Sequence, residues 1–265
     1  MWNPYVELSP RTRQLLGVAG VATVLIIWAL VSGLGLVEKA RLPAPWDVVS
    51  AFFQLLSYNE ARGERLLVVA TAYSLARVAA AAVAVMAVGL PVGILMGASP
   101  AVNAVLSPLV DPFRSAPIVA VLPILVMWLG IDEVMKITFL SLGAVVYLIP
   151  MVRDAIRAVP SSYWVSATDL GATPTEAIRL SVLPMALPRI ADAIIVAISV
   201  MWTYITVAEY VNAQKGLGQL IQNARRFSAM DQVFVGIMVI IGLALLTYAG
   251  MMALKRRLFP WETET

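Results

Sequence analysis

The feature that most constrains the fold is a series of long apolar runs with almost no charge. No charged residue occurs from Leu15 to Val37, and Val233 to Leu254 is uncharged as well. A helix needs about 20 apolar residues to cross the hydrocarbon core of a bilayer. Hydrophobic residues make up 60% of the 265-residue chain and charged residues 13%, whereas ordinary soluble domains carry about 25% charged residues. The sequence therefore predicts a protein that is solvated by lipid.

Several apolar segments have the length of a membrane span. Backbone N–H and C=O groups in lipid must bond within the protein, so such segments are expected to be helices. We therefore expect an all-α polytopic membrane protein with six transmembrane helices in a single domain, residues 1–265. The predicted spans lie at about 15–37, 66–98, 101–131, 135–158, 187–211 and 232–254.

An even number of spans places both chain ends on the same side of the membrane. Arg11 and Arg13 precede the first span, and three basic residues, 255–257, follow the last. Cytoplasmic loops carry an excess of Lys and Arg, so these flanks favour cytoplasmic termini, although the predicted outer loops hold nearly as many basic residues. Residues 41–56 predict a short amphipathic helix, opening after Pro45, at the outer interface.

The residue types that are missing exclude several classes of function. The chain has no cysteine and no histidine, which removes thiol nucleophiles, imidazole proton relays and the commonest zinc ligands. A Walker A loop needs Gly-Lys-Ser/Thr, and no lysine here follows a glycine. The net charge of +3 is too small to indicate nucleic-acid binding. We expect no catalytic residue, no metal site and no cofactor in this chain.

An amphipathic segment, residues 161–183, interrupts the apolar sequence between the fourth and fifth predicted spans. Its apolar residues fall near helical spacing, with a break at Gly171 and Pro174. It is much longer than a usual connection of about 4–6 residues. The pattern predicts two short helices joined by a glycine turn. Their apolar stripe is free either to dock on a partner protein or to lie on the lipid surface.

This segment resembles the cytoplasmic loop of binding-protein-dependent ABC importer permeases, whose pattern is E-A-A-x3-G-x9-I-x-L-P. Gly171 and Leu183–Pro184 match, while Val165 stands in place of the Glu and Ser181 in place of the Ile. The resemblance extends along nearly the whole chain and is closest to the nitrate/sulfonate/taurine/bicarbonate branch. The matching motifs are Leu42–Pro45 (L-P-x-P), Ser74–Val78 (S-L-x-R-V), Arg114–Pro117 (R-x-x-P), Pro123–Gly130 (P-x4-W-x-G), Ala208–Glu209 followed by Gly216–Gly218, and Arg257–Trp261.

The resemblance implies a type I importer fold and the transmembrane permease subunit of an ATP-driven importer in the bacterial inner membrane. It implies a small anion or sulfonate-like solute that an external binding protein delivers and selects. ATP and Mg²⁺ would bind to separate ATPase subunits, and a second permease copy would complete a dimer, expected to be a homodimer. The coupling helices that contact the ATPase would present Ser166, Ala167, Asp169, Leu170, Gly171, Ala172, Thr175 and Glu176.

Charged residues inside the predicted spans are candidates for the solute pathway or its gate. A charge at the centre of a membrane helix costs about 2.5–3.5 kcal/mol on insertion scales, so it usually faces a cavity or a partner. Arg77 and Arg114 either tether neighbouring helices or give the pathway a positive lining for anions. Arg114, near Pro117 in a proline-rich span, is the better candidate. Glu209 either pairs with a basic group across the dimer or is an interface carboxylate.

Three further features bear on packing. Gly89, Gly93 and Gly97 recur at four-residue spacing, which lets helix backbones approach closely, so the second span is expected to be a packing helix. Trp202 either packs between helices or lines the pathway. Asp192 departs from the family, which usually has a small residue there and an arginine three positions later, so anion preference does not follow from that region.

Two other classes of function compete with the permease interpretation. A stand-alone secondary transporter needs ionisable relays and usually two inverted halves, and the sequence shows neither histidine nor a repeat. A membrane-embedded enzyme needs a cluster of nucleophile, base or metal ligands. The acidic residues of this chain are instead scattered among Asp169, Glu176, Asp192 and Glu209.

Overall fold

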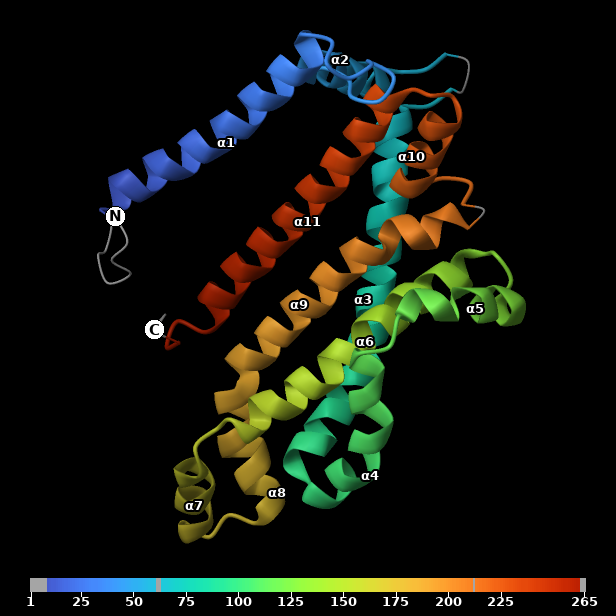
Figure 1. The fold of residues 1–265 in the computed structure, drawn as a ribbon. Helices are drawn as coiled ribbons and strands as arrows, with labels where there is room; N and C mark the ends of the chain where they lie inside the picture. Colours follow the sequence, from blue (N-terminus) through green and yellow to red (C-terminus); the bar gives the residue numbers. More distant parts are fainter. Residues whose placement is uncertain (1–8, 61–62, 212, 263–265) are drawn as a thin grey trace. The chain divides into compact units, whose positions relative to one another are not determined.

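The computed structural model describes residues 9–60, 63–211 and 213–262. Regular structure in these residues is helical, apart from one isolated bridge between Asn59 and Glu64, and the predicted all-α class is confirmed (Figure 1). The helices form two compact units. The first comprises residues 1–67 and 220–237, and the second comprises residues 68–219 and 238–265.

In the first unit, helix α1 (Pro10–Gly33) is apolar on all sides and buries none of its residues. The side chain of Ser9 caps its first turn, so the helix begins before the first predicted span does. Trp28 fastens α1 within the unit, because its indole N–H donates to the Pro43 carbonyl over 3.0 Å and its ring stacks on Phe234. A helix that is apolar all round and unburied in the protein is suited to face lipid.

The short amphipathic helix predicted before the second span is α2 (Pro45–Leu56), which begins at Pro45 as expected. A carboxylate oxygen of Asp47 accepts the N–H of Ala44 at 3.3 Å, which satisfies one donor at the helix start. Three helices run from one unit into the other: α3 (Leu66–Ala98), α10 (Leu217–Arg226) and α11 (Met230–Leu258).

The second unit is built on α3 together with α6 (Glu133–Arg157) and α9 (Leu183–Tyr210). Helices α6 and α9 lie side by side (Figure 1). The ring of Tyr204 on α9 covers Gly143 on α6, where a Cβ would lie 2.7 Å from the ring, and Phe139 meets the same ring edge-on. Tyr204 therefore fills the space that the missing side chain leaves.

Three glycines, one turn apart, line the face of α3 that packs against α6: Gly89, Gly93 and Gly97. A Cβ added to them would lie 2.8 Å from Leu148, 2.7 Å from Val152 and 2.8 Å from Ile156, respectively. These distances are shorter than van der Waals contact, so the two helices pack this closely because the side chains are absent. The predicted packing role of this run is confirmed.

The apolar stretch 101–131, predicted as one span, is not one helix. It consists of α4 (Pro100–Val110), the 3₁₀ turns η1 (Asp111–Arg114) and η2 (Ile118–Val121), and α5 (Leu122–Leu129). The two halves meet at a bend of 96°. Proline lacks the N–H that continues a helix, and it disfavours helical geometry in the residue before it. Pro112 and Pro117 therefore break the run, and Pro117 is extended, with ψ 93°.

Five of the described helices are long and apolar enough to cross a membrane, and the number is six if the bent pair forms one span. The bent pair is held to α6 by an ion pair between Asp111 and Arg153 at 2.9 Å. The broken span is thus attached to the packed helices through a specific contact as well as through the chain.

Gly93→Ala tests the packing between α3 and α6. Alanine is the better helix former by about 1 kcal/mol, but here its methyl would meet both Val152 and the Ile149 carbonyl at under 3 Å. Overpacking of this kind costs about 1–3 kcal/mol, so we expect a lower melting temperature for the detergent-purified protein. The control is Gly250→Ala in α11, which meets nothing within 4 Å and should be neutral or stabilising. Equal melting temperatures for the two variants would contradict the close packing.

Candidate functional site: the coupling segment and a buried ion network

The segment between α6 and α9 begins with α7 (Ser161–Asp169), which ends in a glycine turn. Gly171 has φ +90°, a conformation that residues with a Cβ rarely adopt. The N–H of Ala172 bonds to the carbonyl of Ala167 over 3.0 Å, and the N–H of Gly171 to that of Thr168 over 2.9 Å. This pair of bonds is the Schellman motif, which satisfies carbonyls at the end of a helix.

The chain then enters α8 (Pro174–Ala177) through a reciprocal cap. Thr173 Oγ1 accepts the N–H of Glu176, while Glu176 Oε2 accepts both the hydroxyl and the N–H of Thr173 at 2.7 and 2.8 Å. These two hydrogen bonds, the hydroxyl first, lower the pKa of Glu176 because they stabilise its ionised form. The predicted pair of short helices with a glycine turn between them is confirmed.

Helix α8 continues without a break through a π-helical turn, η3 (Ile178–Val182), into α9. The whole run, Pro174–Tyr210, has 37 residues and a length of about 55 Å, whereas the hydrocarbon core is about 30 Å thick. We therefore expect the polar first residues of this run, including Glu176, to lie outside the hydrocarbon core, and residues 161–182 are called the projecting segment below. The hydroxyl of Ser181 donates to the Tyr163 carbonyl over 3.0 Å, which attaches α7 to this continuous helical run.

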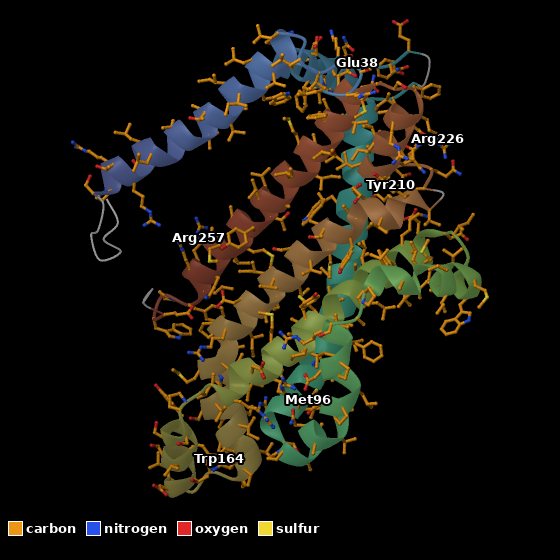
Figure 2. All side chains as sticks on the ribbon, viewed as in Figure 1. Glu38, Met96, Trp164, Tyr210, Arg226 and Arg257 are labelled. Atoms are coloured by element: carbon orange, nitrogen blue, oxygen red, sulfur yellow. The ribbon has the colours of Figure 1, made fainter. Side chains whose placement is uncertain are left out.

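The residues predicted to contact the ATPase lie on α7, the glycine turn and α8, in the segment that carries Trp164 (Figure 2). The two alanines are half-buried, and the other six are exposed: Ser166, Asp169, Leu170, Gly171, Thr175 and Glu176. Leu170 is 89% exposed and Leu180 is 71% exposed. Large apolar side chains exposed on an otherwise polar segment are candidates for a protein-binding surface.

At the opposite end of α6 and α9, a buried arginine joins three helices. Arg77 of α3 is 3% exposed. Its Nε and Nη2 donate to the two carboxylate oxygens of Glu133 at 2.6 and 2.7 Å, while Nη1 donates to Glu209 Oε1 and to the Lys215 carbonyl, both at 2.7 Å. These contacts match the interpretation of Arg77 as a tether, with carboxylates as its main partners.

The second carboxylate of this ion network, Glu209, is completely buried. It accepts the Ser74 hydroxyl over 2.7 Å and the Gly218 N–H over 2.6 Å, and Ser74 Oγ in turn accepts the Leu217 N–H over 2.9 Å. Residues 215–218 are thereby held against α3 and α9. The basic partner of Glu209 is Arg77 of its own chain, whereas the sequence analysis left open a basic partner across the dimer or an interface carboxylate.

The network also contains Lys136, which is 2% exposed. Its Nζ donates to the Ile131 carbonyl over 2.7 Å and lies 3.8 Å from Glu133. Two cations thus face two carboxylates, and the single positive charge of Arg77 is already neutralised. Removing one partner of a buried ion pair costs about 3–5 kcal/mol, whereas an exposed pair contributes about 0–1 kcal/mol.

The other pathway candidates lie elsewhere. Arg114 and Pro117 are exposed at the break between η1 and η2, and Arg114 forms no ion pair with any residue that the structure describes. Trp202 is buried in α9, and its indole N–H has no partner among the described residues. Neither Arg114 nor Trp202 hydrogen-bonds to the ion network within this part of the chain.

Sequence reasoning missed several members of these sites. Ser74 was noticed as part of a motif but was given no role, and Glu133 and Lys136, at the start of the fourth span, were given no role either. Asp192, which departs from the family, pairs with Lys255 at 2.8 Å, and Lys255 also binds Glu262 at 2.7 Å. The only sequence signal for these partners is the presence of an opposite charge in another span.

Comparisons with known proteins bear on this geometry. Residues 89–260 match the family model described as "Binding-protein-dependent transport system inner membrane component". The chain is 36% identical to the taurine transport system permease protein TauC of Escherichia coli K12, over 96% of this chain and 93% of that protein. It is a binding-protein-dependent transport permease. It is also 32% identical to a putative aliphatic sulfonates transport permease protein, SsuC of Bacillus subtilis 168, over 91% of this chain and 85% of that protein.

Solved structures agree on the fold of this permease. An amino acid ABC transporter crystallised with histidines has a chain with a TM-score of 0.62 at 17% identity, covering 79% of this chain and 94% of that one. A chain of the inward-facing MetNI methionine ABC transporter has a TM-score of 0.61 at 22% identity, covering 81% of this chain and 97% of that one. The permease is thus a multi-pass inner-membrane subunit of an ABC importer, and its family is a transport component rather than a catalytic one.

The two carboxylates that bind Arg77 should contribute very differently to stability. Glu209→Gln leaves Arg77 with a neutral partner in a fully buried site, so we expect a loss of about 3 kcal/mol or more in the free energy of unfolding. Glu133→Gln removes a half-exposed partner and should cost less than about 1 kcal/mol. Denaturation of the purified permease followed by tryptophan fluorescence measures both. Similar losses of unfolding free energy in the two variants would show that Glu209 and Glu133 contribute equally to stability, contrary to this prediction.

Proposed function

We propose that this permease imports a small sulfonate, such as taurine or another aliphatic sulfonate, which an external binding protein delivers. The observation that carries the proposal is the similarity to a taurine permease over 96% of the chain. A second relative, from a different organism, is named for aliphatic sulfonates. The sulfonate group is the chemistry that the named solutes of both relatives share.

The energy enters through the projecting segment, which docks in an ATPase subunit that binds ATP and Mg²⁺. This step is supported by the way α7 and α8 are built. Helix α6 ends at Arg157 and leads into α7 after three residues, while α8 runs continuously into α9. A displacement of the segment therefore acts on α6 and α9 together, the two helices that pack side by side in the second unit.

Two copies of the permease pair as a homodimer, and each docks one ATPase. Closure of the ATPases on ATP drives the two coupling segments together and opens the pathway outward, and hydrolysis resets it. Six spans place both termini on the same side as the coupling segment, which is the cytoplasmic side. The basic residues in the last turn of α11, Lys255, Arg256 and Arg257, support this orientation.

The anionic solute needs a positive group that is not already neutralised. Arg77 is bound by two carboxylates, so its charge is not available. Arg114 is exposed at the broken span, where the backbone also leaves the helix. Broken helices present backbone groups and dipole ends at translocation sites. We therefore assign the solute contact to Arg114 and the break at Pro117.

Uptake into proteoliposomes tests the proposed function. The permease is reconstituted with its ATPase and binding protein. The vesicles should accumulate labelled taurine or an alkanesulfonate only when ATP is present on the side of the membrane that the ATPase subunits face. Sulfate at the same concentration should compete weakly, because it lacks the alkyl group that distinguishes sulfonates. Uptake by the permease alone, driven by an ion gradient, would instead support a secondary transporter, and ATP-driven uptake of an unrelated solute would contradict the sulfonate assignment.

Gly171→Val tests the coupling segment. Valine resists the φ of +90° at this turn, so α7 should shift and ATP-driven uptake should fall at least tenfold while the protein stays in the membrane. Gly35→Val is the matched control, because Gly35 also has a positive φ, +68°, and meets nothing within 4 Å. Its uptake should stay within about twofold of the wild type if strain alone is tolerated. An equal loss of uptake in the two variants would show that the turn at Gly171 has no special role in coupling.

A further inference from the structure

The two carboxylates of Arg77 lie in different surroundings. On the Glu209 side the packing is tight. A Cβ at Gly216 would lie 2.5 Å from Arg77 Nη1 and from Glu209 Cδ, and a Cβ at Gly218 would lie 2.8 Å from Glu209 Cβ. Two glycines therefore allow residues 215–218 to close over the buried carboxylate. Water has no access there, since Glu209 is 0% exposed.

On the Glu133 side the packing is open. The Glu133 side chain is 53% exposed although it binds Arg77 through both oxygens. A cavity of about 280 Å³ adjoins it, lined by Ile131, Asp132, Glu133, Val134, Lys136 and Gln214. Water in this cavity can solvate the Glu133 carboxylate as soon as it leaves the guanidinium. The seam between the start of α6 and residue 214 is therefore the weaker boundary of the ion network.

The chain on the Glu133 side enters α6 through a glycine turn. Glu133 is the first residue of α6, and Gly130, three residues earlier, has φ +74° and ψ −153°, a conformation essentially restricted to glycine. Farther along, α6 is fixed by the glycine contacts with α3 and by Tyr204 over Gly143. Release of Glu133 would thus leave the residues between Gly130 and Glu133 with fewer contacts, while α6 from Met135 onward stays packed.

We propose that Arg77 is a positioning residue of the transport cycle, with one permanent and one releasable carboxylate. Arg77 stays bound to Glu209 and to the carbonyl of Lys215, and it releases Glu133 once in each cycle. The seam between Asp132 and Gln214 then opens, and it closes again when Glu133 returns. The proposal rests on the ATP-driven cycle set out under the proposed function, since that cycle supplies the energy for opening.

A reversible cross-link across the seam tests the proposal. The chain contains no cysteine, so Asp132→Cys and Gln214→Cys introduce the only thiols, and a short bis-methanethiosulfonate reagent joins them through reducible disulfides. In the reconstituted complex, linked protein should lose at least 90% of its ATP-driven taurine uptake, and reductant should restore it. The control pair, Lys39→Cys with Asp47→Cys, replaces an exposed ion pair of 2.9 Å in the first unit and should keep its uptake when linked.

A second measurement separates a positioning role from a merely structural one. Glu133→Gln leaves the seam without its closing contact, so ATP hydrolysis in the absence of binding protein should rise several-fold while taurine carried per ATP falls. Glu133→Asp keeps the negative charge and should recover part of the wild-type ratio of taurine transported to ATP hydrolysed. A structural role would lower the yield of folded protein and leave the ratio unchanged.

We call the releasable contact between Arg77 and Glu133 the latch. The outcomes of these experiments distinguish the latch from the proposed function on which it rests. Full uptake by the linked seam, with normal uptake by unlinked protein, overturns the latch and leaves the proposed function intact. Absence of ATP-driven taurine uptake in the unlinked wild-type complex overturns the proposed function, and the latch with it. Loss of uptake that reductant reverses, seen at the seam and not at the control pair, supports both.

Discussion

Lipid offers no hydrogen-bond partners, so each polar group within the spans must find its partner inside the protein. For three basic residues the permease meets this constraint by pairing them with acidic residues from elements that are distant in sequence. Arg77 takes Glu133 and Glu209, Arg153 takes Asp111, and Lys255 takes Asp192. In each pair the two residues come from different helices or turns. The charges that lipid would otherwise reject thus become the specific contacts between helices that are apolar elsewhere.

Local sequence signals predicted the coupling segment well. The break at Gly171 and Pro174 marked the end of one helix and the start of the next, because the αL turn and the reciprocal cap each depend on residues within four positions. The four-residue glycine repeat likewise predicted the packing face of α3. Both signals work because the physical cause lies in the same short stretch that carries them.

The ion network and the bend were beyond such local reasoning. Arg77 and its partners are separated by 56, 132 and 138 positions along the chain, and no spacing rule connects them. For the stretch 101–131 the prolines were visible in the sequence, but hydropathy averages over a window and cannot tell a straight span from one bent by 96°. Glu133 was overlooked for a related reason, since a charge beside a predicted span is read as part of a loop.

The charge balance of the network bears on how a conduit handles an anion. A pathway that bound a sulfonate tightly would slow its release, because passage requires binding weak enough to leave as well as strong enough to enter. With Arg77 neutralised by two carboxylates, that cation organises helices and does not trap solute. Arg114 is exposed at a break in the backbone, where water can screen its charge. Under the proposed function, a screened cation suits passage better than a dry arginine does, and the proposed external binding protein makes the choice of solute.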